Sequence, residues 1–232
     1  SSFNLKMIKN YLFLIISLIS CSNQFQLKEG DLLFQDLDSS PLCDAIELVT
    51  TGYKEASFSH IGIVIKDNDT LKVLEAIPPK VILTKLNDFL NKSSDRQGRP
   101  KVIVGRLKKQ FQHAIPHAIK FSKERLNTDY DEFFLIDNNS YYCSELIYEA
   151  FKKYSIFELH PMTFVHPESQ KTIKTWIEYY SNLNYKIPEG MMGINPGIMS
   201  ISSKIDIVNY TNKIVKVQHF NSEYMFSIIH FI

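Results

Sequence analysis

The sequence predicts an α+β fold, and two observations carry this prediction. Two β-rich segments, 58–65 and 71–77, are joined by the polar turn Lys66-Asp-Asn-Asp69, which is typical of a β-hairpin. Two later segments, 113–126 and 142–154, instead place apolar residues at helical spacing. Because strands and helices are mixed rather than strictly alternating, an α+β fold fits better than a parallel α/β sheet.

The remaining segments follow the same two patterns. The turn signal Glu29-Gly30-Asp31 precedes an expected strand, and Gly52 is expected to end a helix. We expect Asp31 to serve as a turn or cap residue rather than in catalysis. The other expected elements are strands over 32–37 and 101–107, helices over 41–51 and 172–180, and a structured loop over 186–196.

The bulk composition is that of an ordinary globular domain. Hydrophobic residues make up 44% and charged residues 22% of the 232 residues, which argues against intrinsic disorder. Sixteen Phe and twelve Tyr residues are compatible with deep pockets lined by rings. The formal net charge of +1 shows no excess of basic residues of the kind that binds nucleic acid, so we exclude nucleic acid as a partner.

The N-terminus has the features of a bacterial export signal. A short basic region is followed by ten mostly apolar residues, 11–20, a run too short to span a membrane as a helix, which needs ~20 residues. The run ends in Leu18-Ile-Ser-Cys21, which resembles a lipobox, although an ordinary signal peptide could also contain a cysteine. We expect residues 1–21 to be a signal peptide with Cys21 lipidated. Residues 22–232 would then form one domain tethered to a membrane of the bacterial cell envelope, on its periplasmic or outer membrane face.

The three cysteines, Cys21, Cys43 and Cys143, do not form a disulfide framework, because their number is odd and their spacing is wide. Cys43 lies on a predicted helix and is expected to pack there as a small apolar residue. His113 and His117 have a metal-like spacing, but the Glu of an HExxH motif and a third ligand are missing. We therefore expect neither a metal nor a cofactor.

Cys143 lies in Tyr141-Tyr-Cys-Ser-Glu-Leu-Ile147, where the sequence predicts the first turn of a helix. Unpaired backbone N–H groups and the helix dipole favour negative charge at that place. A thiol there is expected to ionise more readily, and the thiolate is the nucleophilic form. The position alone also fits a buried structural cysteine.

His60 and Glu75 lie on the two strands of the predicted hairpin. His60 begins the first strand, which gives its ring the fixed direction that a general base needs. Taken alone, it also fits a surface or core histidine. Glu75 lies in an apolar part of the second strand, where a buried charge needs a partner. With Cys143, the two residues would form a nucleophile, a base and an orienting acid.

Five motifs together resemble the permuted NlpC/P60 hydrolases of the YiiX/YebB type, which are classed as permuted papain-like amidases. In chain order they are Gly30-Asp-Leu-Leu-Phe34, Ser59-His-Ile-Gly-Ile-Val64, Glu75, Asn127-Thr-Asp-Tyr-Asp131 with Phe134, and Tyr142-Cys-Ser-Glu-Leu146. His60 precedes Cys143, as in the permuted branch and in reverse of ordinary papain-like enzymes. Asn127 stands where the family often has Gly, and Asn tolerates a left-handed backbone. The resemblance covers 29–154 and extends toward residue 209.

The resemblance implies a papain-like core in which a helix carrying Cys143 packs on an antiparallel sheet carrying His60 and Glu75. It also implies hydrolysis of an amide or related acyl bond through a thioester. Cys143 would attack the carbonyl, His60 would transfer the proton, and Glu75 would fix the tautomer of His60. The backbone N–H of Cys143 would stabilise the oxyanion. Tyr142 or Tyr130 could add a donor, with core packing as the alternative role of each.

The sequence leaves the substrate open. Peptidoglycan stem peptides are cleaved in the broader superfamily, but we expect no wall-binding module in this chain. A lipid-derived amide or ester is therefore an alternative, with hydrolysis or acyl transfer as the outcome, because Cys21 would hold the site at a membrane. A non-catalytic binding module on the same fold would be expected to lose Cys143, His60 or Glu75, and the sequence keeps all three.

Overall fold

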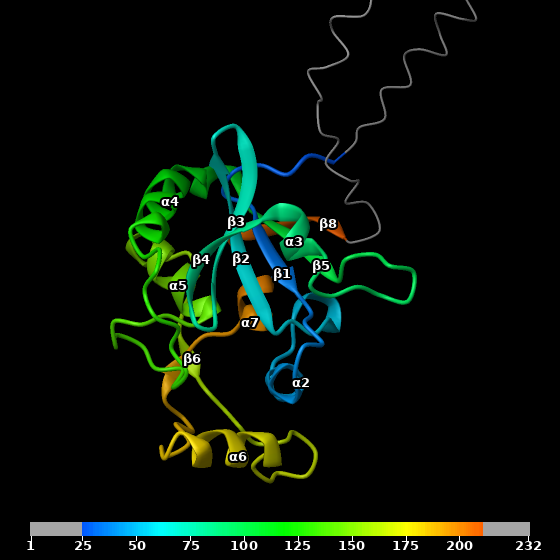
Figure 1. The fold of residues 1–232 in the computed structure, drawn as a ribbon, viewed down its shortest axis with the longest axis vertical. Helices are drawn as coiled ribbons and strands as arrows, with labels where there is room; N and C mark the ends of the chain where they lie inside the picture. The colour runs from blue at the N-terminus through cyan, green and yellow to red at the C-terminus, as the bar shows by residue number, and fades with distance from the viewer. Residues whose placement is uncertain (1–24, 211–232) are drawn as a thin grey trace, which may run out of the picture. The chain divides into compact units, whose positions relative to one another are not determined.

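An antiparallel sheet of six strands forms the centre of the fold (Figure 1). The computed structural model describes residues 25–210, so the predicted signal peptide and Cys21 lie outside the described residues. The strand order in the sheet is β4-β3-β2-β1-β5-β8. The strands are β1 (Leu32–Gln35), β2 (His60–Asp67), β3 (Thr70–Ile77), β4 (Lys80–Lys85), β5 (Val102–Leu107) and β8 (Ile205–Tyr210). Every neighbouring pair is antiparallel, as the family resemblance implies.

Helices of moderate length cover the sheet and extend beyond one end of it (Figure 1). The helix that begins at Cys143 packs against β2 and β3. The helices are α2 (Pro41–Leu48), α3 (Leu86–Leu90), α4 (Ile115–Lys123), α5 (Cys143–Phe151), α6 (Lys174–Asn182) and α7 (Pro196–Ser200). Shorter pieces are the 3-10 segments η1 (Tyr53–Glu55), η2 (Lys109–Ala114) and η3 (Lys152–Tyr154), and a small ribbon of β6 (His160–Pro161) with β7 (Met192–Gly193).

Alternate residues of β2 decide which face of the sheet holds the main core. Ile61, Ile63 and Ile65 are fully buried in one apolar cluster. Leu146 and Ile147 of α5 belong to the same cluster. Burying a side chain of this kind contributes about 1.5–3 kcal/mol. Apolar packing therefore holds α5 against the strand whose first residue is His60.

The short helix α3 covers the opposite face of the sheet. Its Phe89 is fully buried and lies over Gly62, because a Cβ added at Gly62 would be 3.3 Å from Phe89 Cε2 and 2.4 Å from Val73 Cγ1. The register of β2 with β3 places His60, Gly62 and Glu75 on this same face. The two faces of the sheet thus carry different parts of the candidate site.

The structure confirms most of the predicted elements, with their ends shifted by a few residues. The hairpin, the strands predicted over 32–37 and 101–107, and the helix at Cys143 are all present. The helix predicted over 113–126 is shorter, because Pro116 lies in its first turn and the 3-10 segment η2 precedes it. Asn127 has a φ of 68°, a left-handed conformation that Asn tolerates at this position where the family often has Gly.

The sequence patterns do not predict β4, α3 or β8. Strand β4 lies at the edge of the sheet and has only one fully buried residue, so its apolar pattern is weak. The loop expected over 186–196 contains β7 and leads into α7. Asn195 caps α7 by accepting the N–H of Ile198 at 2.8 Å.

The described residues from Leu27 onward belong to one compact unit. The single domain expected over 22–232 stays a prediction, because its ends lie outside the described residues. Between residues 25 and 210, no helix combines the length and the apolar character needed to cross a membrane.

Candidate active site

Cys143 is the first residue of α5, and the structure places it where the sequence predicts. The chain enters the helix through Tyr142, which has an extended backbone, and Glu145 accepts the N–H of Tyr142 at 3.4 Å. The Cys143 side chain is 7% exposed, and its Sγ lies 4.0 Å from the carbonyl oxygen of Ser59. The thiol therefore lies at a helix N-terminus, where the helix dipole favours negative charge.

His60 links the thiol to a carboxylate. Its Nε2 lies 2.5 Å from Oε2 of Glu75, which leaves Nδ1 for Cys143. Burial lowers the pKa of His60 and is the largest single effect. The hydrogen bonds to Cys143 and Glu75 and the charges of both outweigh it and raise the pKa of His60 to about 9. The imidazole is thus held as a cation at neutral pH, between Cys143 and Glu75.

Glu75 is fully buried, yet each of its carboxylate oxygens has donors. Lys92 Nζ lies 2.7 Å from Oε1 and 2.8 Å from Oε2, and the Thr84 hydroxyl also donates to Oε1. Burial raises the pKa of Glu75. The hydrogen bond and charge of His60, followed by those of Lys92, outweigh it and hold this pKa at about 2. Glu75 is therefore an anion throughout the physiological pH range.

The ring of His60 is fixed by packing as well as by hydrogen bonds. Its centroid lies 5.8 Å from that of Phe89 in a tilted arrangement. The Phe89 carbonyl accepts a hydrogen bond from Gln35 Nε2 at 2.9 Å. Gln35 is the β1 partner of His60 in the sheet register. A ring supported in this way is already oriented for proton transfer and does not need to rotate first.

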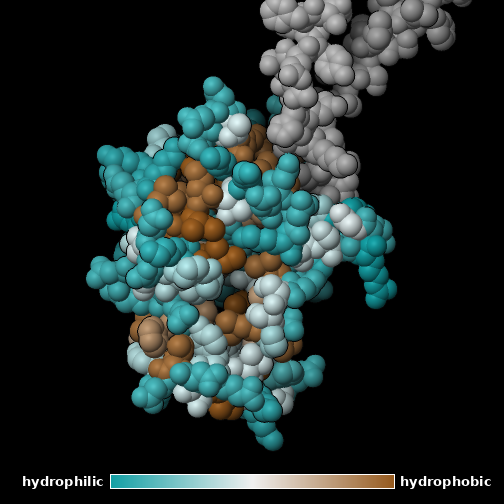
Figure 2. Space-filling model, viewed as in Figure 1, coloured by the Kyte–Doolittle hydropathy of each residue, from teal (hydrophilic) through white to brown (hydrophobic). Residues whose placement is uncertain are grey.

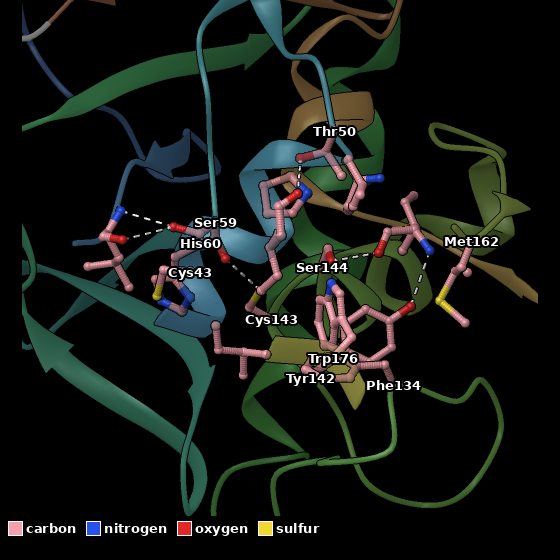
Figure 3. Close-up of a pocket in the computed structure, with 18 of the residues that line it drawn as sticks. Cys43, Thr50, Ser59, His60, Phe134, Tyr142, Cys143, Ser144, Met162 and Trp176 are labelled. Carbon is pink, nitrogen blue, oxygen red and sulfur yellow. Dashed lines mark hydrogen bonds between the residues drawn. The ribbon is translucent and has the colours of Figure 1, made fainter. Parts of the chain in front are cut away.

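A cavity of about 330 Å³ opens beside Cys143. Figure 2 shows hydrophobic residues gathered around a hollow above α6, and Figure 3 shows Cys143 with Ser59 and His60 on one side of the pocket. Phe134, Tyr142, Trp176 and Met162 lie on the other side (Figure 3). The lining is mostly apolar and includes Leu42, Ile46, Val49, Phe134, Met162, Phe164, Trp176, Tyr179 and Ile198.

The two tyrosines predicted as possible oxyanion donors both line this cavity, but their hydroxyl groups differ. The Tyr142 hydroxyl accepts the N–H of Ile194 at 3.2 Å and so anchors that segment. Burial raises the pKa of Tyr130 well above its usual value, and the nearby charge of Cys143 adds to this effect. Burial raises the pKa of Tyr142 in the same way, so both hydroxyl groups keep their protons and both remain candidate donors.

Sequence reasoning missed the groups that surround Glu75. Thr84 lies on β4, which the apolar pattern does not reveal, and Lys92 lies in a polar stretch after α3. A buried carboxylate such as Glu75 implies a hydrogen-bonding partner. Which residue is that partner depends on the strand register and on the path of the chain after β4. Cys43, expected to pack on its helix, is partly exposed and lines the cavity.

Asp31, His113 and His117, which the sequence also singles out, make structural contacts away from Cys143. The carboxylate of Asp31 is buried and pairs with Arg106 Nε at 2.7 Å, in agreement with a structural role. The rings of His113 and His117 both contact Tyr154 edge-on. Within residues 25–210, no three His, Cys, Asp or Glu side chains gather closely enough to hold a metal ion.

Comparison with known proteins agrees with this geometry. The family model described as "Permuted papain-like amidase enzyme, YaeF/YiiX, C92 family" matches residues 26–209. Among solved structures, the chain is similar to the crystal structure of the metalloprotein YiiX from Escherichia coli O157:H7, with 22% identity and a TM-score of 0.64. The alignment covers 80% of this chain and 98% of that one, and supports the α+β fold alone. The comparison with curated proteins gives no match.

Proposed function

We propose, from the premise that this chain belongs to the permuted papain-like amidases of the YaeF/YiiX type, that it is a thiol hydrolase for amides with an apolar acyl group. The family supplies the reaction class, hydrolysis by a cysteine. The proposed substrate class rests on one observation, the mostly apolar cavity of about 330 Å³ beside Cys143.

The arrangement of Cys143 and His60 supports a two-step reaction. The Cys143 thiolate attacks the amide carbon, and the carbonyl oxygen takes negative charge near the N-terminus of α5. His60 then gives its Nδ1 proton to the leaving nitrogen, the C–N bond breaks, and an amine departs from a thioester. Water next attacks the thioester, giving its proton to His60. The carboxylic acid leaves and the Cys143–His60 pair is restored.

The cavity fits an acyl chain better than a peptide rich in carboxylates. Each buried CH₂ group contributes about 0.8 kcal/mol, so an alkyl chain in this pocket supplies useful binding energy. Among the described residues that line the cavity there is no Lys or Arg to pair with a substrate carboxylate. Peptidoglycan stem peptides carry such groups, and burying them unpaired is costly. We therefore favour an N-acyl amide over a stem peptide.

Hydrolysis of defined amides tests this proposal. We expect amine release from N-acyl amides with kcat/KM rising with acyl length up to the limit of the cavity, and no release by Cys143→Ala. Purified stem peptides, incubated in parallel and analysed by mass spectrometry, provide the competing substrate. Cleavage of stem peptides without cleavage of any N-acyl amide would reject the substrate class and keep the thiol hydrolase.

We also propose that the protein works at a membrane surface of the bacterial envelope. The support is the Leu18-Ile-Ser-Cys21 sequence, which resembles a lipobox. A lipid anchor would hold the cavity close to a source of acylated amides. Metabolic labelling with a fatty-acid analogue should mark the wild type and not Cys21→Ala. Equal labelling of both would exclude Cys21 as the lipidated residue.

A further inference from the structure

We propose that Lys92 is a positioning residue of this active site, which keeps Glu75 ionised and aimed at His60 so that the Cys143–His60 ion pair can form. This inference rests on the thiol hydrolase mechanism proposed above, and not on the identity of the acyl substrate. Neither the sequence motifs nor the family match points to this lysine.

The contacts around Glu75 hold its carboxylate in one orientation. The Lys92 ammonium lies within 2.8 Å of both carboxylate oxygens, so it bridges them. Oε1 also accepts from Thr84, which leaves the remaining lone pair of Oε2 for His60 Nε2. The carboxylate is thus held by donors on all sides, and it cannot rotate away from the imidazole without breaking a charged hydrogen bond.

Charge balance in the site also favours a cation beside Glu75. The working site holds a thiolate on Cys143, an imidazolium on His60 and a carboxylate on Glu75. These three groups sum to one negative charge in a buried place, which is costly. Lys92, whose side chain is 24% exposed, supplies the missing positive charge without leaving contact with water. With Lys92 present, Glu75 can stay ionised beside the ion pair and need not take up a proton.

The position of Lys92 in the fold connects it to His60 as well as to Glu75. It follows α3 by two residues, on the face of the sheet opposite α5, and its Nζ lies 5.4 Å from the Phe89 ring centroid. Phe89 packs in turn on the ring of His60. One short segment, 89–92, therefore supports both the base and the acid that orients it. This second support comes from the side of the sheet that carries no nucleophile.

The experiment compares Lys92→Met and Lys92→Arg with wild type. We expect Lys92→Met to lower kcat by about 10- to 100-fold, a loss typical of a misplaced reacting group, with KM changed by less than about 2-fold. In the pH profile of kcat/KM for Lys92→Met, the acidic limb should move to higher pH, because Glu75 loses the cation that favours its ionised form. Lys92→Arg should restore most of the rate. Lys72→Met is the matched control, since Lys72 pairs with Asp67 at the far end of the same hairpin.

A second readout needs no substrate, so it separates this inference from the proposed function. The rate of Cys143 alkylation by iodoacetamide, followed by peptide mapping, reports thiolate formation directly. We expect Lys92→Met to slow alkylation below neutral pH and Lys92→Arg to leave it near the wild-type rate. If alkylation follows this pattern while no N-acyl amide is cleaved, the acyl substrate is wrong and the role of Lys92 stands.

Combining Lys92→Met with Glu75→Gln distinguishes a positioning role of Lys92 from a general contribution to the stability of the fold. In the Glu75→Gln background there is no anion for Lys92 to hold, so adding Lys92→Met should slow alkylation by less than about 3-fold. An equal loss in both backgrounds would overturn the proposal. So would a Lys92→Arg variant as slow as Lys92→Met, or a Lys92→Met variant whose pH profile matches that of wild type.

Discussion

Opposite charges alternate through the candidate site when the thiol and the imidazole form an ion pair. The order is Cys143, His60, Glu75 and Lys92, and each group contacts the next. Opposite charges in contact are much less costly to bury than any one of them alone. The raised pKa of His60 and the lowered pKa of Glu75 are two effects of this one arrangement.

At the residue scale we predict the alkaline limit of activity. His60 must hold a proton to give to the leaving nitrogen, so kcat/KM should fall as pH rises through about 9, the pKa of this group. Replacing Glu75 with Gln removes an anion that favours the imidazolium. The limb should therefore move to lower pH, and kcat/KM near neutral pH should drop by roughly 10²-fold or more. A pH profile of both enzymes checks this; an unmoved limb in Glu75→Gln would contradict the role of Glu75.

Local patterns predict the elements of this fold that carry the nucleophile and the base, and miss those that support them. The hairpin over β2 and β3 and the start of α5 follow from alternation, helical spacing and turn residues. These patterns are strong because the segments bury one face in the main core. Strand β4 and helix α3 have short or half-buried patterns, and their position depends on tertiary contacts. Thr84 lies on β4, Phe89 lies on α3 and Lys92 follows α3 by two residues, so the sequence does not reveal their contacts with Glu75 and His60.

At the element scale we predict that Gly62 is required for α3 to support His60. A Cβ at Gly62 would lie 2.4 Å from Val73 Cγ1 and 3.3 Å from Phe89 Cε2, so Gly62→Ala forces the strand or α3 to shift. We expect a loss of about 1–3 kcal/mol in the free energy of unfolding, as for other overpacked cores, together with a lower kcat. Denaturant unfolding and steady-state kinetics measure the two effects.

Gly98→Ala is the control for this prediction. Gly98 has a φ of +73°, and a Cβ there would meet nothing within 4 Å. The control therefore strains the backbone without touching α3 or the sheet. It should lower stability and leave kcat unchanged. A kcat for Gly62→Ala equal to that of wild type would show that His60 does not depend on the packing of Phe89.

At the scale of the whole molecule, the candidate active site joins parts of the chain that lie far apart in sequence. The juxtaposition of Cys143, His60 and Glu75 can be predicted because five motifs in a fixed order resemble one family, and residues 26–209 match that family. The apolar cavity beside Cys143 cannot be predicted from the sequence, because its walls come from α2, the segment 160–164, α6 and the segment 193–198. Each of these segments carries ordinary apolar residues, and only the tertiary fold brings them together beside Cys143.

Because α2 forms part of the cavity wall, a larger side chain on α2 should reduce the space for an acyl chain. Ile46 of α2 lines the cavity, so Ile46→Trp should fill part of its volume. If the cavity holds the acyl chain, KM for long-chain amides should rise at least several-fold, because each CH₂ excluded from the pocket loses about 0.8 kcal/mol. KM for a short-chain amide should stay near the wild-type value, since a short chain does not reach the filled part. Ile177→Trp on α6 is the control, because Ile177 is 50% exposed and is not among the lining residues. An equal rise in KM for short and long chains would place the acyl group elsewhere and would favour a substrate bound across the mouth of the cavity.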